Sequence, residues 1–264
     1  MNLNIFQWHS LKTRVTISTL TFFLVGIWSL MFYSSYTLHN DMEQTLGEQQ
    51  FSTVSIIAAD INSEINDRLR ALEKVAALIT PAIMDNAASV QKNLEERPVL
   101  GLMFNAGINV TRLDGVVIAD VPISMGRIGN NYSDRNHVAG ALKGKSTIGN
   151  PVMGKMVKAP IVPIAVPILD KGKVIGTLTG ITNLAIPNFL SKITDNIYGK
   201  TGGYLLVSRQ LRTIVYATDK KRIMEVLPGP GINPLLDRFI QGYEGSDVYV
   251  TSLGVEVLGS AKGI

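Results

Sequence analysis

Residues 15–38 (VTISTLTFFLVGIWSLMFYSSYTL) carry no charged side chain, and this run constrains the chain more than any other feature. A lipid hydrocarbon core is ~30 Å thick, and about 20 apolar residues in a helix cross it. Lys12 and Arg14 precede the run, and cations tend to stay on the cytoplasmic side. The sequence therefore predicts a cytoplasmic tail over residues 1–14, a transmembrane helix over residues 15–36, and the bulk of the chain outside the membrane.

A cleaved secretory signal is the alternative explanation of this run. The apolar region of a signal is about 7–15 residues long and leads to a small-x-small cleavage site. The run here is longer, and it ends at Tyr33, Ser34, Ser35 and Tyr36, where aromatic side chains suit a membrane interface. Length and exit residues favour an uncleaved anchor.

The composition argues against several classes of function. The 264 residues include 25 basic and 21 acidic side chains, a net charge of +4, with no dense Lys/Arg stripe, so nucleic acid is not an expected partner. Cys is absent, which removes disulfides, thiol nucleophiles and cysteine-bound metals. Of the three His, His9 and His39 fall in or beside the predicted membrane region and only His137 remains. Neither a metal site nor a cofactor is expected.

Catalytic motifs are also missing from the sequence. Gly199-Lys200-Thr201 resembles the tail of a phosphate-binding loop, but Thr194 stands where that motif needs its first Gly. No Gly-x-Ser-x-Gly nucleophile motif occurs. The chain is therefore not expected to be an enzyme, and no catalytic residue is assigned.

Residues 39–80 have the periodicity of a long helix. The segment lacks Pro, and its one Gly is Gly47. Apolar residues recur every three or four positions, which is the spacing of one helical face. These residues are Val54, Ile57, Ile61, Ile65, Leu69, Leu72, Ala76 and Ile79, and the charged residues Asp60, Glu64, Asp67, Arg68, Glu73 and Lys74 are expected on the other face. The pattern predicts that the membrane helix continues as a stalk over residues 37–80 and ends at Pro81.

The apolar stripe of this stalk has two possible partners. It can pack on the chain's own domain, or on the same helix of a second copy. The stripe is longer than one domain face, so both contacts are expected, and the chain is predicted to form a homodimer through the stalk.

Past Pro98 the pattern changes to period two, which indicates strands. Turns at Leu113–Asp114–Gly115 and at Asp170–Lys171–Gly172–Lys173 predict two hairpins. Strands are expected over 110–112, 116–119, 151–156, 161–168 and 174–181, with a loop over 123–131 and a helix over 136–142 that Ser133 or Asp134 caps. An antiparallel sheet with helices on its faces is an α+β domain.

A shorter version of the same order follows. A connecting helix is expected over 186–196, strands over 203–208, 213–217, 246–252 and 255–260, and a helix over 234–241. This second module lacks a closing strand, so we expect it to be incomplete and the chain to be a fragment that continues past Ile264.

Two segments, YSDRNHVAGALKGKSTIGNPV and IVPIAVPILDKGKVIGTLTGITNL, together with the anchor and stalk resemble the double-Cache sensor ectodomains of bacterial receptors. The matching residues are Asp134, Arg135, His137, Ala141, Leu142 and Gly144; Gly149, Pro151 and Val152; and Pro167, Ile168, Asp170, Gly172 and Gly176. The resemblance covers residues 40–260 and is strongest over 107–184. It implies two PAS-like modules on the stalk, a membrane-distal one over 81–190 and a membrane-proximal one over 191–264.

The same resemblance implies a place and a role for the chain. Double-Cache sensors stand in the bacterial inner membrane with the ectodomain in the periplasm or outside the cell. Their output, after a second membrane helix, is a chemotaxis, histidine-kinase or diguanylate-cyclase module. The implied function is the sensing of a small solute.

In the resembling sensors a ligand lies between the distal sheet and the loop and helix that carry the motif Arg. Arg135 would grip an anion with its planar fork of donors, with Tyr132 and His137 as walls. The full candidate set for ligand binding is Arg135, His137, Tyr132, Asn150, Asn183 and Asp120. The structural alternatives are a salt bridge of Arg135 with Asp134 or Asp120, a plain half-buried ring for His137, and a core position for Tyr132.

The sequence departs from the subset of the family that binds amino acids. That subset reads Arg-x-Trp-Tyr-x-x-Ala, whereas His137 and Val138 replace the aromatic pair here. Where the subset holds the ligand's ammonium with acids, this chain offers Asn150 and Asn183, and a buried ammonium without a carboxylate partner is costly. A small carboxylate or another anion is therefore the expected ligand.

Two further points stay open at the level of sequence. Lys155 and Lys158 either add positive field near the mouth of the site or are simply solvated. A membrane-anchored scaffold or interaction protein without a ligand is the alternative function, and a second membrane span after Ile264 would favour the sensor.

Overall fold

The computed structural model describes residues 11–195, 199, 201–250 and 254–264. The chain divides into two compact units, Met1–Val54 with Glu244–Lys262, and Ser55–Tyr243 with Gly263–Ile264. Part of the predicted connection between the last two strands, residues 251–253, lies outside the described residues, as does Asn196 of the predicted connecting helix.

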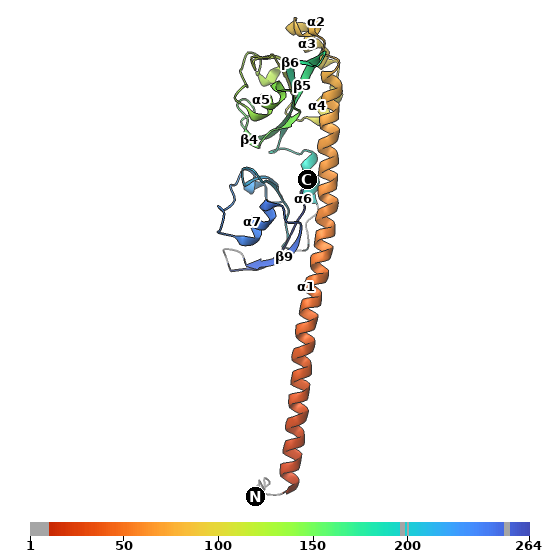
Figure 1. Cartoon of the computed structure of the whole chain (residues 1–264), viewed down its shortest axis with the longest axis vertical. Helices are drawn as coiled ribbons and strands as arrows, with labels where there is room; N and C mark the ends of the chain where they lie inside the picture. The colour runs from red at the N-terminus through yellow and green to blue at the C-terminus, as the bar shows by residue number, and fades with distance from the viewer. Residues whose placement is uncertain (1–10, 196–198, 200, 251–253) are drawn as a thin grey trace. The chain divides into compact units, whose positions relative to one another are not determined.

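Helix α1 (Leu11–Ala76) runs without interruption from the uncharged segment through the stalk (Figure 1). It is the one helix among the described residues that is long and apolar enough to cross a membrane. This confirms the prediction of a long N-terminal apolar helix that continues as a stalk. The helix ends before Pro81, which instead begins the short helix α2 (Pro81–Met84).

In the first unit, the hairpin of β9 (Gly245–Val250) and β10 (Glu256–Ala261) packs on α1. Ser246 Oγ donates to the Gly47 carbonyl at 2.6 Å, and Gln50 Nε2 donates to the Leu258 carbonyl at 3.2 Å. A Cβ on Gly47 would lie 3.2 Å from Ser246 Cβ. The close approach of the hairpin explains why the one glycine of the predicted stalk stands at this position.

The second unit contains a six-stranded antiparallel sheet with the order β2-β1-β6-β5-β3, in which β4 also pairs with β5. Its strands are β1 (Ile108–Thr111), β2 (Val117–Val121), β3 (Thr147–Ile148), β4 (Val152–Met153), β5 (Pro160–Asp170) and β6 (Lys173–Asn183). The two predicted hairpins join β1 to β2 and β5 to β6. This is the α+β architecture that the sequence predicts.

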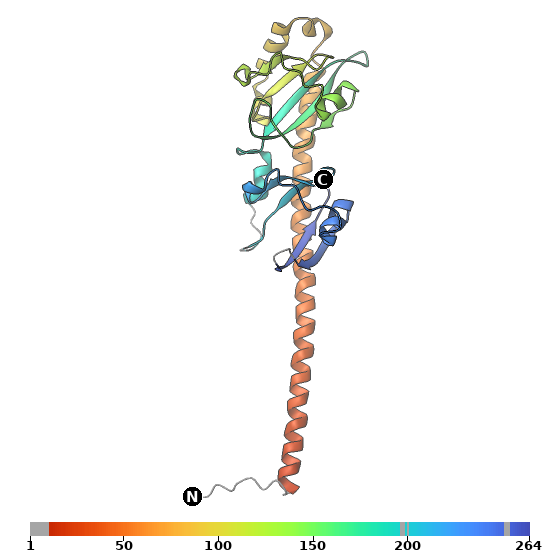
Figure 2. The same ribbon diagram turned by 90° about the vertical axis from the view of Figure 1, so that its left-hand side faces the viewer.

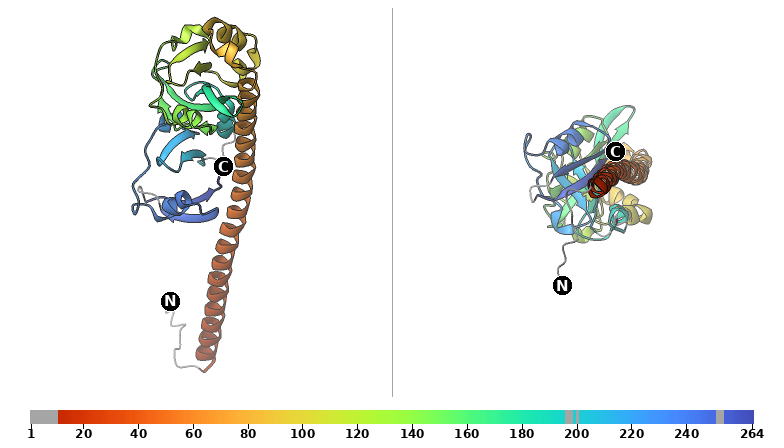
Figure 3. Two further views of the ribbon diagram at one scale, coloured as in Figure 1. Left: turned by 45° about the horizontal axis from the view of Figure 1, so that its top comes forward. Right: turned by 90° about the horizontal axis from the view of Figure 1, so that it is seen from below.

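One face of this sheet is apolar and forms the main core. Val110, Val166 and Leu178 lie across from one another on neighbouring strands and pack with Leu72 and Ala76 of α1. Helices α2, α3 (Ala87–Glu95) and α4 (Pro98–Met103) complete this layer. Figure 3 (left) shows α2 and α3 at the C-terminal end of α1.

The opposite face of the sheet is covered by α5 (Asn136–Leu142), which packs on β3, β5 and β6. Figure 1 shows the sheet between α5 and the C-terminal part of α1. Figure 2 views the same sheet from the side of α5, with α1 behind it. The loop between β2 and α5 contains the short 3₁₀ turn η1 (Ile123–Met125).

The rest of the second unit is smaller. After β6 come η2 (Phe189–Ser191), α6 (Lys192–Asp195), β7 (Leu205–Ser208), β8 (Thr213–Ala217), η3 (Lys220–Arg222) and α7 (Pro234–Gln241). Strands β7 and β8 form a two-stranded antiparallel sheet. Tyr216 of β8 is buried against Ile61 of α1 with Leu190 and Ile193.

Four local expectations are wrong. The strand predicted over 151–156 is only Val152–Met153. The helix predicted to start at residue 186 starts at Phe189, because Asn188 caps it reciprocally with Ser191. Neither Ser133 nor Asp134 caps α5, whose first flanking residue is Arg135.

The fourth wrong expectation concerns the exposure of Arg68. The charge pattern of the stalk places it on the solvent-exposed face, but it is only 7% exposed. The boundary expected between modules at 190/191 stays a prediction.

Candidate functional site

The face of the sheet beneath α5 carries a row of polar side chains. Asn109 of β1 lies opposite both Asp120 of β2 and Thr179 of β6, so the three side chains point to the same face. All three residues are buried. Two residues further along each strand, Thr111 of β1 and Thr177 of β6 share a hydroxyl–hydroxyl hydrogen bond of 2.7 Å. This face is therefore built for polar contacts, in contrast to the apolar face behind it.

A buried ion pair lies at one end of this row of polar side chains. Arg127, in the loop between β2 and α5, is 2% exposed, and Asp120 is fully buried. Arg127 Nε and Nη2 lie 2.7 and 2.5 Å from Asp120 Oδ1, and the Arg127 amide donates to Asp120 Oδ2 at 3.0 Å. Arg127 Nη1 donates to the Ala106 carbonyl at 2.9 Å. Asp120 is therefore the partner of Arg127 and does not form the alternative salt bridge with Arg135.

Arg135 stands at the start of α5 and is weakly partnered. Its Nε is 3.8 Å from Asp134 Oδ2, beyond hydrogen-bond distance, and the Arg135 side chain is 22% exposed. Among the described residues, the buried side-chain atoms without a hydrogen-bond partner are Arg135 Nε, Thr179 Oγ1 and Arg127 Nη2, the last of which still ion-pairs with Asp120. Two of the three atoms belong to arginine forks, which bind carboxylates and other oxyanions well.

His137 follows Arg135 on α5 and is 7% exposed. A Cβ on Gly149 would lie 3.0 Å from His137 Nδ1 and 2.6 Å from Pro163 Cγ, so the ring fills the space that this glycine leaves. Burial, together with the nearby Arg135 charge, lowers the pKa of His137 to about 4. The ring is therefore neutral at pH 7 and adds no charge to the site.

Tyr132 and Lys155 lie at the outer side of the site. Burial raises the pKa of the half-buried Tyr132, and the charges of Arg127, Asp120 and Arg135 all act on its hydroxyl. Lys155 Nζ is 5.2 Å from the centre of the Tyr132 ring and 3.2 Å from Asp134 Oδ1. Lys155 thus links the turn that precedes β5 to the loop that carries Tyr132 and Asp134, and its role in the electrostatics of a site stays a prediction.

The two asparagines of the candidate set differ from this group. The Asn183 side chain accepts from the Ala185 amide at 2.9 Å and so shapes the turn after β6. Asn150 is half-buried and directly follows Gly149, the residue against His137. Lys158 adopts a left-handed backbone (φ 53°) in the turn before β5. Tyr132 is close enough to Asp120 and Arg135, and His137 to Arg135, for their charges to act on it, whereas Asn183 serves the backbone. The joint role of these residues in a site stays a prediction.

Sequence reasoning missed Arg127, Asn109 and Thr179. The signal for two of them was present, because Ile108-Asn109-Val110-Thr111 and Thr177-Leu178-Thr179 alternate polar with apolar residues, which places the polar ones on one face. Arg127 had no such signal, since it lies in an irregular loop.

The electrostatic balance of the site favours an anion. Arg127 and Arg135 contribute two positive charges, and Asp120 contributes the one fully buried negative charge. The Asp134 side chain is 62% exposed and forms an ion pair with Lys155. The inner part of the site thus carries an excess of positive charge with hydrogen-bond donors, an arrangement that can bind a carboxylate or similar group.

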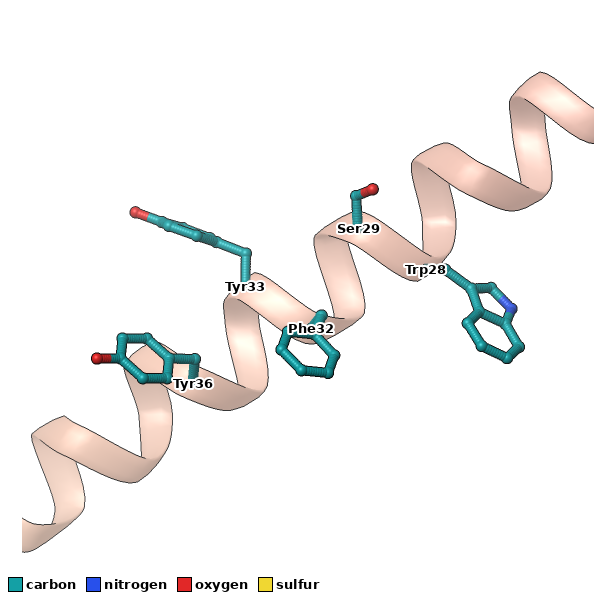
Figure 4. A pocket seen from close by; sticks show the side chains of 5 residues that line it. All are labelled: Trp28, Ser29, Phe32, Tyr33 and Tyr36. Carbon is teal, nitrogen blue, oxygen red and sulfur yellow. The ribbon is translucent and has the colours of Figure 1, made fainter.

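A hollow on α1 is a different kind of surface. It is lined by Trp28, Ser29, Phe32, Tyr33 and Tyr36, which project from successive turns of the helix (Figure 4). All five belong to the uncharged run, and aromatic residues of this kind suit a membrane interface. The hollow has no charged group with which to recognise an ionic solute.

Comparison with protein-family models finds no match, and comparison with curated proteins finds none. Several solved structures share the fold. The ligand-binding domain of the Pseudomonas fluorescens chemoreceptor CtaA in complex with L-alanine has a TM-score of 0.61 at 19% identity, covering 81% of this chain and 88% of that one. The V. cholerae histidine kinase DctB sensor domain has a TM-score of 0.59 at 14% identity, covering 76% of this chain and 78% of that one.

A third similar structure is the ligand-binding domain of the Pseudomonas aeruginosa amino acid chemoreceptor PctB in complex with L-Arg. Its TM-score is 0.58 at 23% identity, covering 70% of this chain and 76% of that one. These structures are sensor and ligand-binding domains of receptors, not catalytic domains. The likeness of fold to extracytoplasmic sensor domains, predicted from the sequence, is thereby confirmed.

The first prediction concerns the buried pair. Asp120→Ala leaves the Arg127 guanidinium buried without its counter-ion, and breaking such a pair costs about 3–5 kcal/mol. We expect the free energy of unfolding of the full chain, measured by urea titration in detergent micelles, to fall by that order. The control is Arg112→Ala, which removes the exposed pair with Asp114 at 3.0 Å and should leave stability unchanged. Equal effects of the two substitutions would contradict the structural role given to Asp120.

The second prediction follows from the pKa of His137. The unfolded histidine titrates near 6.5 and the folded one at about 4, so between these values only the unfolded chain binds the proton. Stability should therefore fall as the pH drops from 6.5 to about 4, by up to roughly 3 kcal/mol, and this group adds no slope above pH 6.5. The measurement is urea titration across this range, with the imidazole followed by NMR. His137→Gln should flatten the slope, whereas His39→Gln, changed at an exposed residue, should retain it.

Proposed function

We propose that this chain is the ligand-sensing, extracytoplasmic part of a bacterial membrane receptor, and that it binds a small carboxylate or another anion in the distal module. The observation that carries the proposal is the Arg135 guanidinium, whose buried Nε has no hydrogen-bond partner and lies 3.8 Å from the carboxylate of the exposed Asp134. The shared fold with receptor sensor domains supports the sensing role.

The contacts available to a carboxylate are complementary to it. An Arg fork grips a carboxylate with two parallel hydrogen bonds, which are stronger than neutral ones because both partners are charged. Thr179 Oγ1 offers a further donor from the floor of the site. Tyr132 and the neutral ring of His137 supply walls without adding charge. One small anion is proposed to contact both the charged fork and this hydroxyl.

An amino acid fits this site less well than a plain carboxylate. Asp120 is the fully buried acid of the described site, and it is already paired with Arg127, whose Nη2 and Nε lie 2.5 and 2.7 Å from Asp120 Oδ1. Asp134 faces solvent and contacts Lys155. An ammonium group bound inside the site would therefore lack a carboxylate partner, and burying such a charge is costly.

The placement in the cell follows from α1. We propose that residues 15–36 span the bacterial inner membrane, with residues 1–14 in the cytoplasm and the two modules in the periplasm or outside the cell. The uncharged run, the cations before it and the aromatic residues at its end support this topology.

The third prediction tests the ligand class with pairs that differ only in an ammonium group. The pairs are L-alanine and propionate, L-serine and 3-hydroxypropionate, and 4-aminobutyrate and butyrate. The amino member of each pair is bound by a structurally similar receptor domain. We expect the member without the ammonium group to bind at least about ten-fold more tightly to the full chain, measured by calorimetry in lipid nanodiscs. Tighter binding of the amino members would contradict the proposed class.

The clamp itself is tested by Arg135→Met, which keeps much of the apolar stem. Loss of a charged hydrogen bond worth roughly 1.5–3 kcal/mol weakens binding about ten-fold or more. Arg112→Met, on the exposed hairpin of the same sheet, is the matched control and should bind normally. If no carboxylate or inorganic phosphate binds the parent chain, the scaffold function becomes the better description.

We further propose that the chain forms a homodimer through the stalk. Residues of the predicted apolar stripe such as Ile61 and Leu72 are buried within the second unit itself, so the contact would use Ile56, an apolar residue outside the stripe that is 65% exposed. The chain has no Cys, so single-cysteine variants report one position each. We expect Ile56→Cys in nanodiscs to form a disulfide dimer on oxidation, and Asn62→Cys, exposed about one third of a turn around the helix, to do so far less. Equal cross-linking of both would argue against a stalk interface.

A further inference from the structure

Arg68 is a buried charge at the centre of the stalk's contacts with the rest of its unit. Its Nη1 donates to the Glu64 carbonyl at 3.0 Å and to Glu64 Oε2 at 2.5 Å. Its Nε donates to the Met103 carbonyl at 3.3 Å, and its guanidinium lies 4.0 Å from the centre of the Phe189 ring. One side chain of α1 therefore contacts both the end of α4 and the start of η2.

Glu64 extends this group to α6. Its Oε1 accepts from Lys192 Nζ at 3.1 Å, while its Oε2 contacts Arg68. The hydrogen bond from Arg68 and then that from Lys192 lower the pKa of Glu64, so the carboxylate stays ionised between the two cations. The group of Arg68, Glu64, Phe189 and Lys192, which we call the stalk junction, joins α1 to the segment that leads out of the large sheet.

The stalk junction is also linked to the candidate site through the start of β1. Met103, which accepts from Arg68, stands three residues before Ala106, and the Ala106 carbonyl accepts from Arg127 Nη1 at 2.9 Å. Asn105 lies between them, and its side chain accepts from the Asn183 amide at 2.7 Å and donates to the Pro187 carbonyl at 3.1 Å. Residues 103–106 thus form a short backbone segment that accepts a hydrogen bond from Arg68 at one end and from Arg127 of the charged pair at the other.

The burial of the Arg68 guanidinium makes its contacts with Met103 and Phe189 costly to lose. Arg68 is surrounded by protein, so a shift of Met103 or Phe189 relative to α1 would leave its buried Nε without a hydrogen-bond acceptor, which is costlier than losing an exposed contact, although Glu64 of the same helix stays paired with Nη1. A small displacement of residues 103–106 therefore either moves α1 with it or breaks the junction.

We propose that Arg68 is the positioning residue that couples the ligand site to the stalk helix. The proposal rests on the function proposed above and deepens it, because it assigns the route by which occupancy of the site reaches α1. Arg68 touches no ligand and acts through Met103 and Ala106. By linkage, a residue that couples two sites affects ligand affinity and the response of the stalk together.

The experiment compares Arg68→Met with Arg70→Met, which removes an exposed arginine two residues away on the same helix. Both full chains are placed in lipid nanodiscs, and amide hydrogen exchange is followed by mass spectrometry. In the free protein, we expect Arg68→Met to speed exchange at least ten-fold over residues 103–107 and also over residues 120–127 of the site. Arg70→Met should change neither segment. A change confined to residues 103–107 would show that Arg68 is only a local structural contact and would overturn the proposal.

A second arm uses butyrate as the probe. In the parent chain, butyrate should slow exchange over residues 60–76 of α1. In Arg68→Met, we expect butyrate still to protect residues 120–135 but no longer residues 60–76, and Arg68→Lys should restore part of the effect. Protection of the stalk that persists in Arg68→Met would overturn the coupling role. Absence of butyrate binding to the parent chain would count against the proposed ligand class alone, since the ligand-free arm still decides the role of Arg68.

Discussion

The period-two alternation of β1 and β6 is the constraint on which the rest of the second unit depends. Even-numbered residues such as Val110 and Leu178 point to one face, and odd-numbered residues such as Asn109 and Thr179 to the other. The apolar face must be buried against α1 and its neighbours, because several fully buried aliphatic side chains provide most of the driving force for folding. The polar face is then left for α5 and its loop, and the site is the direct result.

A buried polar face is stable only if its charges are matched. Asp120 and Arg127 match each other and also tie the loop to β2 and to Ala106. Arg135, in contrast, is left with an acid at 3.8 Å that solvent also reaches. The two arginines stand only eight positions apart in sequence, yet one is paired with an acid in the core and the Nε of the other has no hydrogen-bond partner.

Much of this fold could be predicted from the sequence. The uncharged run, the absence of Pro up to Pro81 and the two hairpin turns determine α1, β1–β2 and β5–β6, and α5 occupies the predicted residues 136–142. Arg135 and His137 are candidates through their resemblance to a family motif, and Tyr132 stands in the same segment just before it; their role in a site stays a prediction. Arg127 and Arg68 could not be identified, because an arginine in a loop and an arginine in a charged helical face look solvated until tertiary packing surrounds them. The extent of β4 was also beyond the sequence, since edge pairing depends on the neighbouring strand.

The ion pair between Lys155 and Asp134 has a consequence for the medium in which the domain works. Both side chains are substantially exposed, at 40% and 62%, and pairs of this kind contribute at most about 1 kcal/mol. Dissolved ions screen them over a Debye length of about 8 Å at physiological ionic strength. The turn that carries Lys155 is therefore held less firmly to the loop of Tyr132 and Asp134 at high ionic strength than at low.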